Sequence, residues 1–212
     1  MLKINEIYNS IQGESTKAGL PCTFIRLTYC NLRCTYCDTA YAFYEGREMS
    51  FDEILSEVRK FDCKLIEITG GEPLFQKESL DLMKLLGDEG FEVLLETGGS
   101  LPIQDIDKRV KIIMDLKCPS SGMVKKNLYD NIHYLKPVDE VKFVIGTQED
   151  YDWTKDILRQ YNLTKICPVL FSVVFGKLEP VTLVEWMLKD KLDVRFQLQM
   201  HKFIWEPTAK GV

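Results

Sequence analysis

The chain has 212 residues, of which 45% are hydrophobic and 28% are charged, and its formal net charge is -5. This composition is typical of a globular protein with one core or at most two, and the acidic balance argues against a surface that binds nucleic acid. The first residues are polar and no apolar run reaches transmembrane length, so we expect a cytoplasmic protein without a membrane partner. Seven cysteines, an odd number, argue against a disulfide framework and leave metal binding or burial as their uses.

Short apolar runs mark the expected strands in chain order. These strands are expected at residues 3–8, 23–28, 64–69, 91–96, 110–115, 140–145, 165–170 and 193–198. A turn-rich stretch at 9–15 follows the first strand, and Pro168 weakens the pairing expected for 165–170 because proline lacks a backbone N–H. Helices are expected from the capping box at Ser50 onward and over 79–86, 149–161 and 180–191.

Strands that alternate with helices predict βαβ units and a parallel sheet. The connection between strands 91–96 and 110–115 is short and has no helical pattern, which indicates an incomplete helical layer. We therefore predict an α/β fold, a partial (β/α) barrel with a mostly parallel sheet, in a single domain over residues 1–212. Such barrels bind ligands at the carboxyl ends of their strands, and polar residues gather at those ends in this sequence.

Three cysteines, Cys30, Cys34 and Cys37, form a C-x3-C-x2-C motif directly after the strand at 23–28. Thiolates at this density bind soft metal centres. Plain burial is one alternative; a structural zinc site is another, but it needs four ligands and only Cys22 offers a fourth nearby in sequence. Three thiolates leave one iron of a four-iron cluster open to a small molecule, and we favour this reading, a 4Fe–4S cluster.

A second motif, Gly70-Gly71-Glu72-Pro73, follows the strand at 64–69. By itself it is as consistent with a glycine turn as with a ligand site. Glycines let backbone groups approach a ligand closely, and Glu72 offers an acceptor for an ammonium group. Asp38 and Thr39, next to Cys37, either cap a turn or supply oxygen ligands to a hard cation; from the residues alone the turn is favoured.

Two basic residues stand at or within expected strands. Arg26 either pairs with a local carboxylate or binds a substrate carboxylate bidentately, and we favour the second. Lys117, beside Asp115 at a strand end, has the same two readings. His201 is expected to be a structural residue, because a lone histidine seldom serves as a ligand or base, and His133 is expected on the surface.

The cysteine spacing, with the aromatic Tyr36 before the third cysteine, and the Gly-Gly-Glu-Pro motif resemble the radical S-adenosylmethionine superfamily. The resemblance implies that the open iron chelates the amino and carboxylate groups of S-adenosylmethionine. It also implies a 5′-deoxyadenosyl radical, formed by reductive cleavage, that abstracts a hydrogen atom, so that no protein side chain is the catalytic group.

Longer segments narrow the resemblance to the 7-carboxy-7-deazaguanine synthase family. They are residues 6–14, 23–27, 37–39, 96–99 and 197–205, so that the resemblance spans nearly the whole chain. It implies ring contraction of 6-carboxy-5,6,7,8-tetrahydropterin with loss of ammonia, a homodimer, and an electron donor such as flavodoxin or ferredoxin. The short N- and C-terminal extensions are expected to form part of the substrate site.

The resemblance also assigns site residues by the positions that match. The cluster ligands are Cys30, Cys34 and Cys37. The S-adenosylmethionine site takes Tyr36, Cys37, Asp38, Gly71, Glu72, Asp115, Leu116 and Lys117. Thr39 is the Mg2+ ligand, and the resemblance outweighs the turn reading there. The substrate contacts are Ile11, Gln12, Gly13, Arg26, Thr69 and Val212.

Two other functions use the same motifs. A glycyl-radical-activating enzyme shares the cysteine loop but acts on a protein, and it would not need Arg26 for a pterin carboxylate. A non-catalytic iron–sulfur or zinc protein would serve electron transfer or structure. Metal analysis and the visible spectrum of anaerobic protein separate the last alternative from the radical enzymes.

Overall fold

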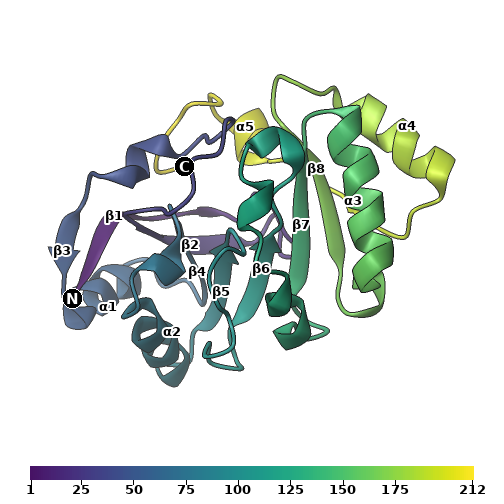
Figure 1. The fold of residues 1–212 in the computed structure, drawn as a ribbon. Coiled ribbons are helices and arrows are strands. Elements are labelled where there is room, and N and C mark those ends of the chain that lie inside the picture. Colours follow the sequence, from purple (N-terminus) through teal and green to yellow (C-terminus); the bar gives the residue numbers. More distant parts are fainter.

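The computed structural model describes residues 1–212 and has one nine-stranded sheet at its centre (Figure 1). The sheet order is β3-β1-β2-β4-β5-β6-β7-β8-β9. The strands are β1 Leu2–Ile11, β2 Pro21–Leu27, β3 Arg47–Met49, β4 Leu65–Gly70, β5 Glu92–Thr97, β6 Lys111–Asp115, β7 Glu140–Ile145, β8 Val169–Val173 and β9 Arg195–Phe196. All pairs from β2 to β9 are parallel, whereas β1 is antiparallel to β2 and β3. The predicted mostly parallel sheet is confirmed.

The helices cover the outer face of this sheet only in part. They are α1 Phe51–Arg59, α2 Ser79–Asp88, α3 Gln148–Tyr161, α4 Pro180–Asp190 and the short α5 His201–Ile204. No helix separates β5 from β6, and β6 and β7 are joined by 3-10 turns. The predicted incomplete helical layer is therefore confirmed. None of the helices has the length and apolar character that crossing a bilayer requires.

The alternation of side chains along the strands separates an apolar outer face from a mixed inner face. On β4, Ile66 and Ile68 belong to the large core that the helices cover. Their neighbours on the inner face are Leu65, Glu67 and Thr69, of which only Leu65 is in the small apolar cluster inside the barrel. The inner face is thus apolar near the start of β4 and polar toward its carboxyl end.

Four strands differ from the sequence prediction, and β1, β3 and β8 are three of them. β1 continues through Asn9 and Ser10, where we expected a turn, because both residues pair with β2. The strand β3, Arg47–Met49, was not predicted because its residues carry no apolar pattern. The strand expected at 165–170 begins instead at Val169, directly after Pro168, which cannot donate to a sheet ladder.

The last strand is shorter than predicted because its later residues bond elsewhere. β9 pairs with β8 over only two residues, whereas the expected strand ran over 193–198. Gln197 accepts a hydrogen bond from the backbone N–H of Ser15 at 2.9 Å, and Gln199 donates to Glu14 at 2.9 Å. Residues 197–199 therefore turn away from the sheet toward the loop that joins β1 to β2.

Hydrogen bonds link the cysteine loop to the N-terminus of α3 through residues 120 and 121. Asp150, fully buried, accepts hydrogen bonds from the backbone N–H groups of Ser120 at 2.8 Å and Gly146 at 2.9 Å. Thr35, between the second and third cysteines, in turn donates to the carbonyls of Ser121 and Ser120. The position of the cysteine loop thus depends on a carboxylate from another part of the chain.

We predict that Asp150→Ala lowers the free energy of unfolding by about 2–4 kcal/mol, because it leaves several buried N–H donors without an acceptor. Asp156→Ala on the same helix is the matched control, since its side chain is mostly exposed, and its effect should be within about 0.5 kcal/mol. Urea unfolding followed by circular dichroism measures both. Equal stability of the two variants would contradict the role given to Asp150.

Candidate active site

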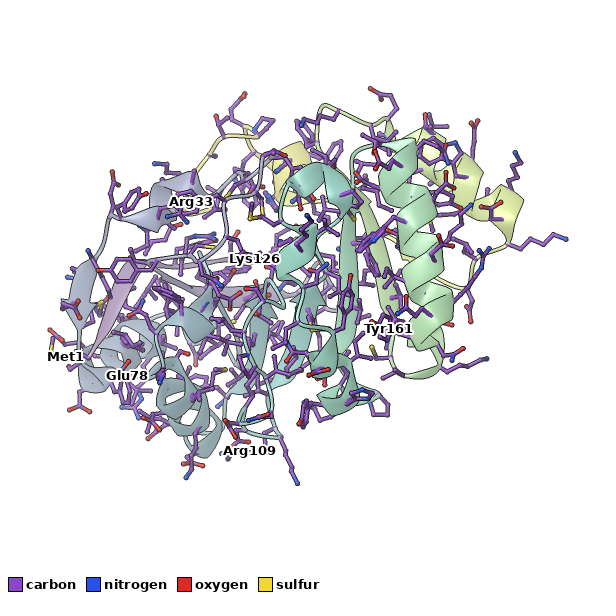
Figure 2. The ribbon with its side chains drawn as sticks, viewed as in Figure 1. Met1, Arg33, Glu78, Arg109, Lys126 and Tyr161 are labelled. Atoms are coloured by element: carbon purple, nitrogen blue, oxygen red, sulfur yellow. The ribbon has the colours of Figure 1, made fainter.

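The carboxyl ends of the strands surround a cavity of about 840 Å³. Figure 2 labels Arg33 in the cysteine loop at this upper end, and Arg109, two residues before β6, at the opposite end. All predicted site residues except Glu72 and Leu116 line the cavity. The C-terminal residues 207–212 line it as well, and Figure 1 shows the tail beside the cysteine loop. The volume is that of a pocket for a cofactor or drug-sized ligand.

The three thiols of the motif share this cavity, whereas no other cysteine reaches it. Burial raises the pKa of Cys30, Cys34 and Cys37, and the charge of a neighbouring thiolate raises each of the first two further. Lys117 acts in the opposite direction on all three, since its positive charge favours a thiolate. Three soft donors beside one ammonium group fit the chemistry of an anionic iron–sulfur cluster.

The Gly-Gly-Glu-Pro motif packs against the cysteine loop. A Cβ on Gly71 would overlap the Tyr29 carbonyl, so only glycine allows this close approach. Glu72 is fully buried, and its carboxylate accepts from the backbone N–H of Leu74 and Gly98 and from the Thr97 hydroxyl. We expected Glu72 to accept a hydrogen bond from the cofactor, but its carboxylate is already bonded within the protein. Gly71 lines the cavity and its carbonyl accepts no hydrogen bond from the chain, which leaves that carbonyl available as an acceptor.

The end of β6 presents one free acceptor. Asp115 contacts the ammonium of Lys117 at 2.9 Å through Oδ2, while its buried Oδ1 has no hydrogen-bond partner. An unpartnered buried oxygen on a cavity wall fits a ligand that brings an N–H or O–H donor. Although burial opposes it, the Asp115 carboxylate keeps the pKa of Lys117 above its ordinary value. Leu116, by contrast, is fully buried in the core and reaches no ligand.

Asp38 and Thr39 face the cavity and are tied to the C-terminal segment. The Thr39 hydroxyl donates to Asp38 Oδ1 at 2.9 Å, and the ammonium of Lys202 lies 2.7 Å from Oδ2. Although burial opposes it, Lys202 and Thr39 lower the pKa of Asp38 to about 2. The Asp38 carboxylate therefore stays ionised. No three His, Cys, Asp or Glu side chains converge on a single metal ion, so a cation at Thr39 would draw most of its ligands from bound molecules.

Arg26 lies on the cavity wall but is paired within the chain. Its Nε donates to Glu6 at 2.7 Å and its Nη2 donates to the Tyr8 hydroxyl at 2.8 Å. The reading that we did not favour, a local carboxylate partner, is thus present, while Nη1 makes no hydrogen bond. The Tyr41 hydroxyl also donates to Glu6, and Lys210 of the tail lies over the Tyr41 ring at 4.2 Å. The side chains around Arg26 come from β1, the loop after the cysteines and the tail.

The predicted substrate residues Gln12 and Gly13 line the cavity with Ile11, Thr69 and Val212. Gln12 is committed to the protein: its backbone pairs with Leu20 and Gly19, and its side chain donates to Glu67. Gly13 is needed for close approach, because a Cβ there would lie 2.7 Å from Nδ1 of His201. His201 itself lines the cavity, and its imidazole makes no hydrogen bond within the chain. We had expected it to be a structural residue. His133 is exposed, as expected.

A buried ionic network in the cavity wall was not predicted from the sequence. Lys142, whose side chain is 5% exposed, contacts Glu14 at 2.8 Å and also Glu96 and, at 3.8 Å, Asp115. Glu67 joins the network beside Glu96. A signal was present: Lys142 and Glu67 each interrupt an apolar strand, as Arg26 does, and buried charges need partners.

We predict that Lys142→Met lowers the free energy of unfolding by about 3–5 kcal/mol, because it leaves Glu14 and Glu96 without their buried counter-ion. Lys189→Met, at an exposed position of α4, is the control and should change stability by less than about 0.5 kcal/mol. Chemical unfolding at pH 7 provides the measurement. If Lys142→Met were as stable as the control, the ion pairs would contribute nothing to the fold.

Comparison with known proteins gives consistent matches over the whole site. The sequence matches the radical SAM superfamily over residues 24–177. It is 47% identical to the 7-carboxy-7-deazaguanine synthase of Chlorobaculum tepidum over 100% of this chain and 97% of that protein. Identity to the enzyme of the same name from Koribacter versatilis is 46% over 100% of both chains. The fold is similar to the crystal structure of QueE from Escherichia coli, with a TM-score of 0.77, 21% identity and 94% of each chain covered.

Proposed function

Because the chain belongs to the radical SAM superfamily and, within it, to the 7-carboxy-7-deazaguanine synthase family, we propose that it converts 6-carboxy-5,6,7,8-tetrahydropterin into 7-carboxy-7-deazaguanine with loss of ammonia. This is a step in the biosynthesis of queuosine and other 7-deazapurines. The observation that carries the proposal is that one cavity contains the three thiols, free acceptors for an amino acid cofactor and Arg26. We also propose that residues 1–212 form a single domain and that the N- and C-terminal extensions form part of the substrate site.

The cofactor end of the cavity is proposed to be the side lined by the cysteines. Cys30, Cys34 and Cys37 would hold a 4Fe–4S cluster. The Gly71 carbonyl and Asp115 Oδ1 would accept hydrogen bonds from bound S-adenosylmethionine, beside Tyr36, Asp38 and Lys117. Once bound, the cluster and S-adenosylmethionine would supply a 5′-deoxyadenosyl radical for hydrogen-atom abstraction from the substrate. The protein's part is to exclude water and to hold the substrate carbon next to that radical.

The substrate end is proposed to lie between Arg26, Thr69, residues 11–13 and the tail that ends at Val212. Since Nε and Nη2 of Arg26 are bonded to Glu6 and Tyr8, the free Nη1 would make a single charge-assisted hydrogen bond to the substrate carboxylate. This replaces the bidentate contact that the sequence suggested. The His201 imidazole is free to accept or donate a further hydrogen bond.

Mg2+ is proposed to bind at Thr39 together with the substrate carboxylate. The support is the position of the half-buried Thr39 on the cavity wall, where its hydroxyl oxygen has lone pairs left after donating to Asp38. A hard cation there would orient the carboxylate during the rearrangement.

The proposal extends to the partners that the family resemblance implies. These are a one-electron donor such as flavodoxin or ferredoxin, and a second copy of the chain in a homodimer. A cytoplasmic location is included because all seven cysteines are free, which suits a reducing compartment.

The proposed reaction is tested directly by a turnover assay. We expect anaerobically reconstituted protein with a reductant, S-adenosylmethionine, Mg2+ and the carboxypterin to yield 7-carboxy-7-deazaguanine, detected by mass spectrometry. Omission of Mg2+ should reduce the yield. An intact cluster that gives no deazaguanine product would overturn the assignment of substrate and leave the superfamily in place.

We predict that Arg26→Ala lowers kcat/KM for the carboxypterin on the order of 100-fold, because it removes a partly buried charge that faces the substrate carboxylate. Reductive cleavage of S-adenosylmethionine without substrate should continue, since Arg26 does not contact the cofactor end. Arg47→Ala, an exposed arginine on β3, serves as the control. Unchanged kcat/KM in Arg26→Ala, with the cluster spectrum intact, would show that the carboxylate binds elsewhere.

A further inference from the structure

One part of the cavity wall holds more carboxylates than cations. Glu14, Glu67, Glu96 and Asp115 line it, and the ammonium groups among them are Lys117 and Lys142. Three of the four carboxylates lie within 4.0 Å of one of these lysines. Glu67 has no cation at that distance, although it is only 2% exposed. A buried carboxylate without a counter-ion is strongly disfavoured, so its charge must be removed in another way.

The neighbours of Glu67 indicate how this happens. Its Oε2 accepts a hydrogen bond from Nε2 of Gln12. On the neighbouring strand β5, Leu94 is the register partner of Glu67, so Glu96, two residues further on, lies beside Glu67 on the same face of the sheet, and it also contacts Lys142. Two carboxyl groups in this contact are stable only if they share a proton, because two negative charges side by side repel. Lys142 stabilises the negative charge on Glu96, so the proton belongs on Glu67.

We propose that Glu67 is a positioning residue: its carboxyl group is protonated, donates a hydrogen bond to Glu96, and so holds the Glu96 carboxylate against Lys142 at the cavity wall. Burial and the Glu96 charge raise the pKa of Glu67 well above its ordinary value. Although burial opposes it, Lys142 lowers the pKa of Glu96. Opposite shifts in two adjacent carboxyl groups are the usual sign of such a division of roles.

The consequence for the site rests on the proposed function. With Glu67 neutral, Glu96 keeps one fixed negative charge and one fixed orientation, and it can accept hydrogen bonds from the amino and N–H groups of a pterin ring. Gln12 donates to the Oε2 atom of Glu67, and this hydrogen bond does not need the proton. Loss of the proton would therefore remove the hydrogen bond that orients Glu96 while the contact to Gln12 remains.

The charged and titratable groups around Glu67 allow a test by pH. Tyr8 and Cys22 face it from β1 and β2, Glu14 from the loop, Glu96 from β5 and Lys142 from β7. Burial raises the pKa of Tyr8 to about 12 and that of Cys22 above its ordinary value, so both stay neutral between pH 6 and pH 8.5. An unfolded Glu67 is ionised across this range while the folded one keeps its proton, so the pKa difference makes folding less favourable as pH rises from about 4.3.

Glu67→Gln is the decisive variant, because its amide donates to Glu96 and accepts from Gln12 as the protonated acid does. We expect it to retain the wild-type KM for the carboxypterin within about threefold. Its melting temperature should exceed that of the wild type by more at pH 8.5 than at pH 6, since glutamine has no proton to retain. Glu67→Leu, which lacks the donor, should raise KM at least tenfold while S-adenosylmethionine cleavage without substrate continues.

Infrared spectroscopy of the holoenzyme in H2O and D2O gives a readout independent of turnover and of the folding of Glu67→Leu. The carbonyl stretch of a protonated carboxylic acid should be present in the wild type at pH 7, shift in D2O and be absent from Glu67→Gln. Absence of this band from the wild type, or a tenfold increase of KM in Glu67→Gln, would overturn the proposal. If no pterin were turned over at all, the infrared band and the melting temperatures would still decide it, so its failure is distinguishable from failure of the proposed function.

Discussion

The ion pairs of Lys142 are the interaction on which the site most depends. The barrel is open, because its sheet ends at two short edge strands and does not close on itself. Lys142, on the inner face of β7, reaches Glu14 in the loop after β1, which lies far from it in the sheet order. Gln197 and Gln199, which follow β9, donate to the same Glu14. The contacts of the Glu14 carboxylate thus connect the loop after β1 to β7 and to the segment after β9. They join the two sides of the open barrel, between which there is no strand pairing.

This arrangement explains why the site can be both enclosed and charged. A fully closed barrel of eight strands fills its interior with side chains. Here the inner face carries an apolar cluster at one end only, and polar side chains surround the cavity at the other. Asp115 and Lys142 are directly paired across β6 and β7, which places opposite charges on neighbouring strands where they compensate each other. The same ion pairs therefore stabilise the cavity wall and hold the carboxylate acceptors in place for a ligand.

The sequence predicted the architecture well because apolar strands, capping boxes and glycine turns are local signals. It also predicted the cysteine loop, since the spacing of three thiols is itself the functional feature. It did not predict that the Glu72 carboxylate accepts hydrogen bonds from Leu74, Thr97 and Gly98, because these bonds depend on how one loop packs on the next. The local pairing of Arg26 with Glu6 arises from the register of β1 against β2, which a hydrophobic pattern does not specify. Lys142 and Glu67 are also charged residues within apolar strands. Because a buried charge needs a partner, as it does at Arg26, these residues predict the ionic network as well.

Transfer of a labelled hydrogen atom is the most direct measurement of whether the cavity holds cofactor and pterin together. Substrate deuterated at C6 is turned over by the reconstituted enzyme, and the recovered S-adenosylmethionine is analysed by mass spectrometry. If the cysteine end and the Arg26 end serve one reaction, deuterium appears in the 5′ position of the adenosyl group together with the deazaguanine product. Product formed with no deuterium in the cofactor, or cleaved cofactor without product, would contradict a shared site.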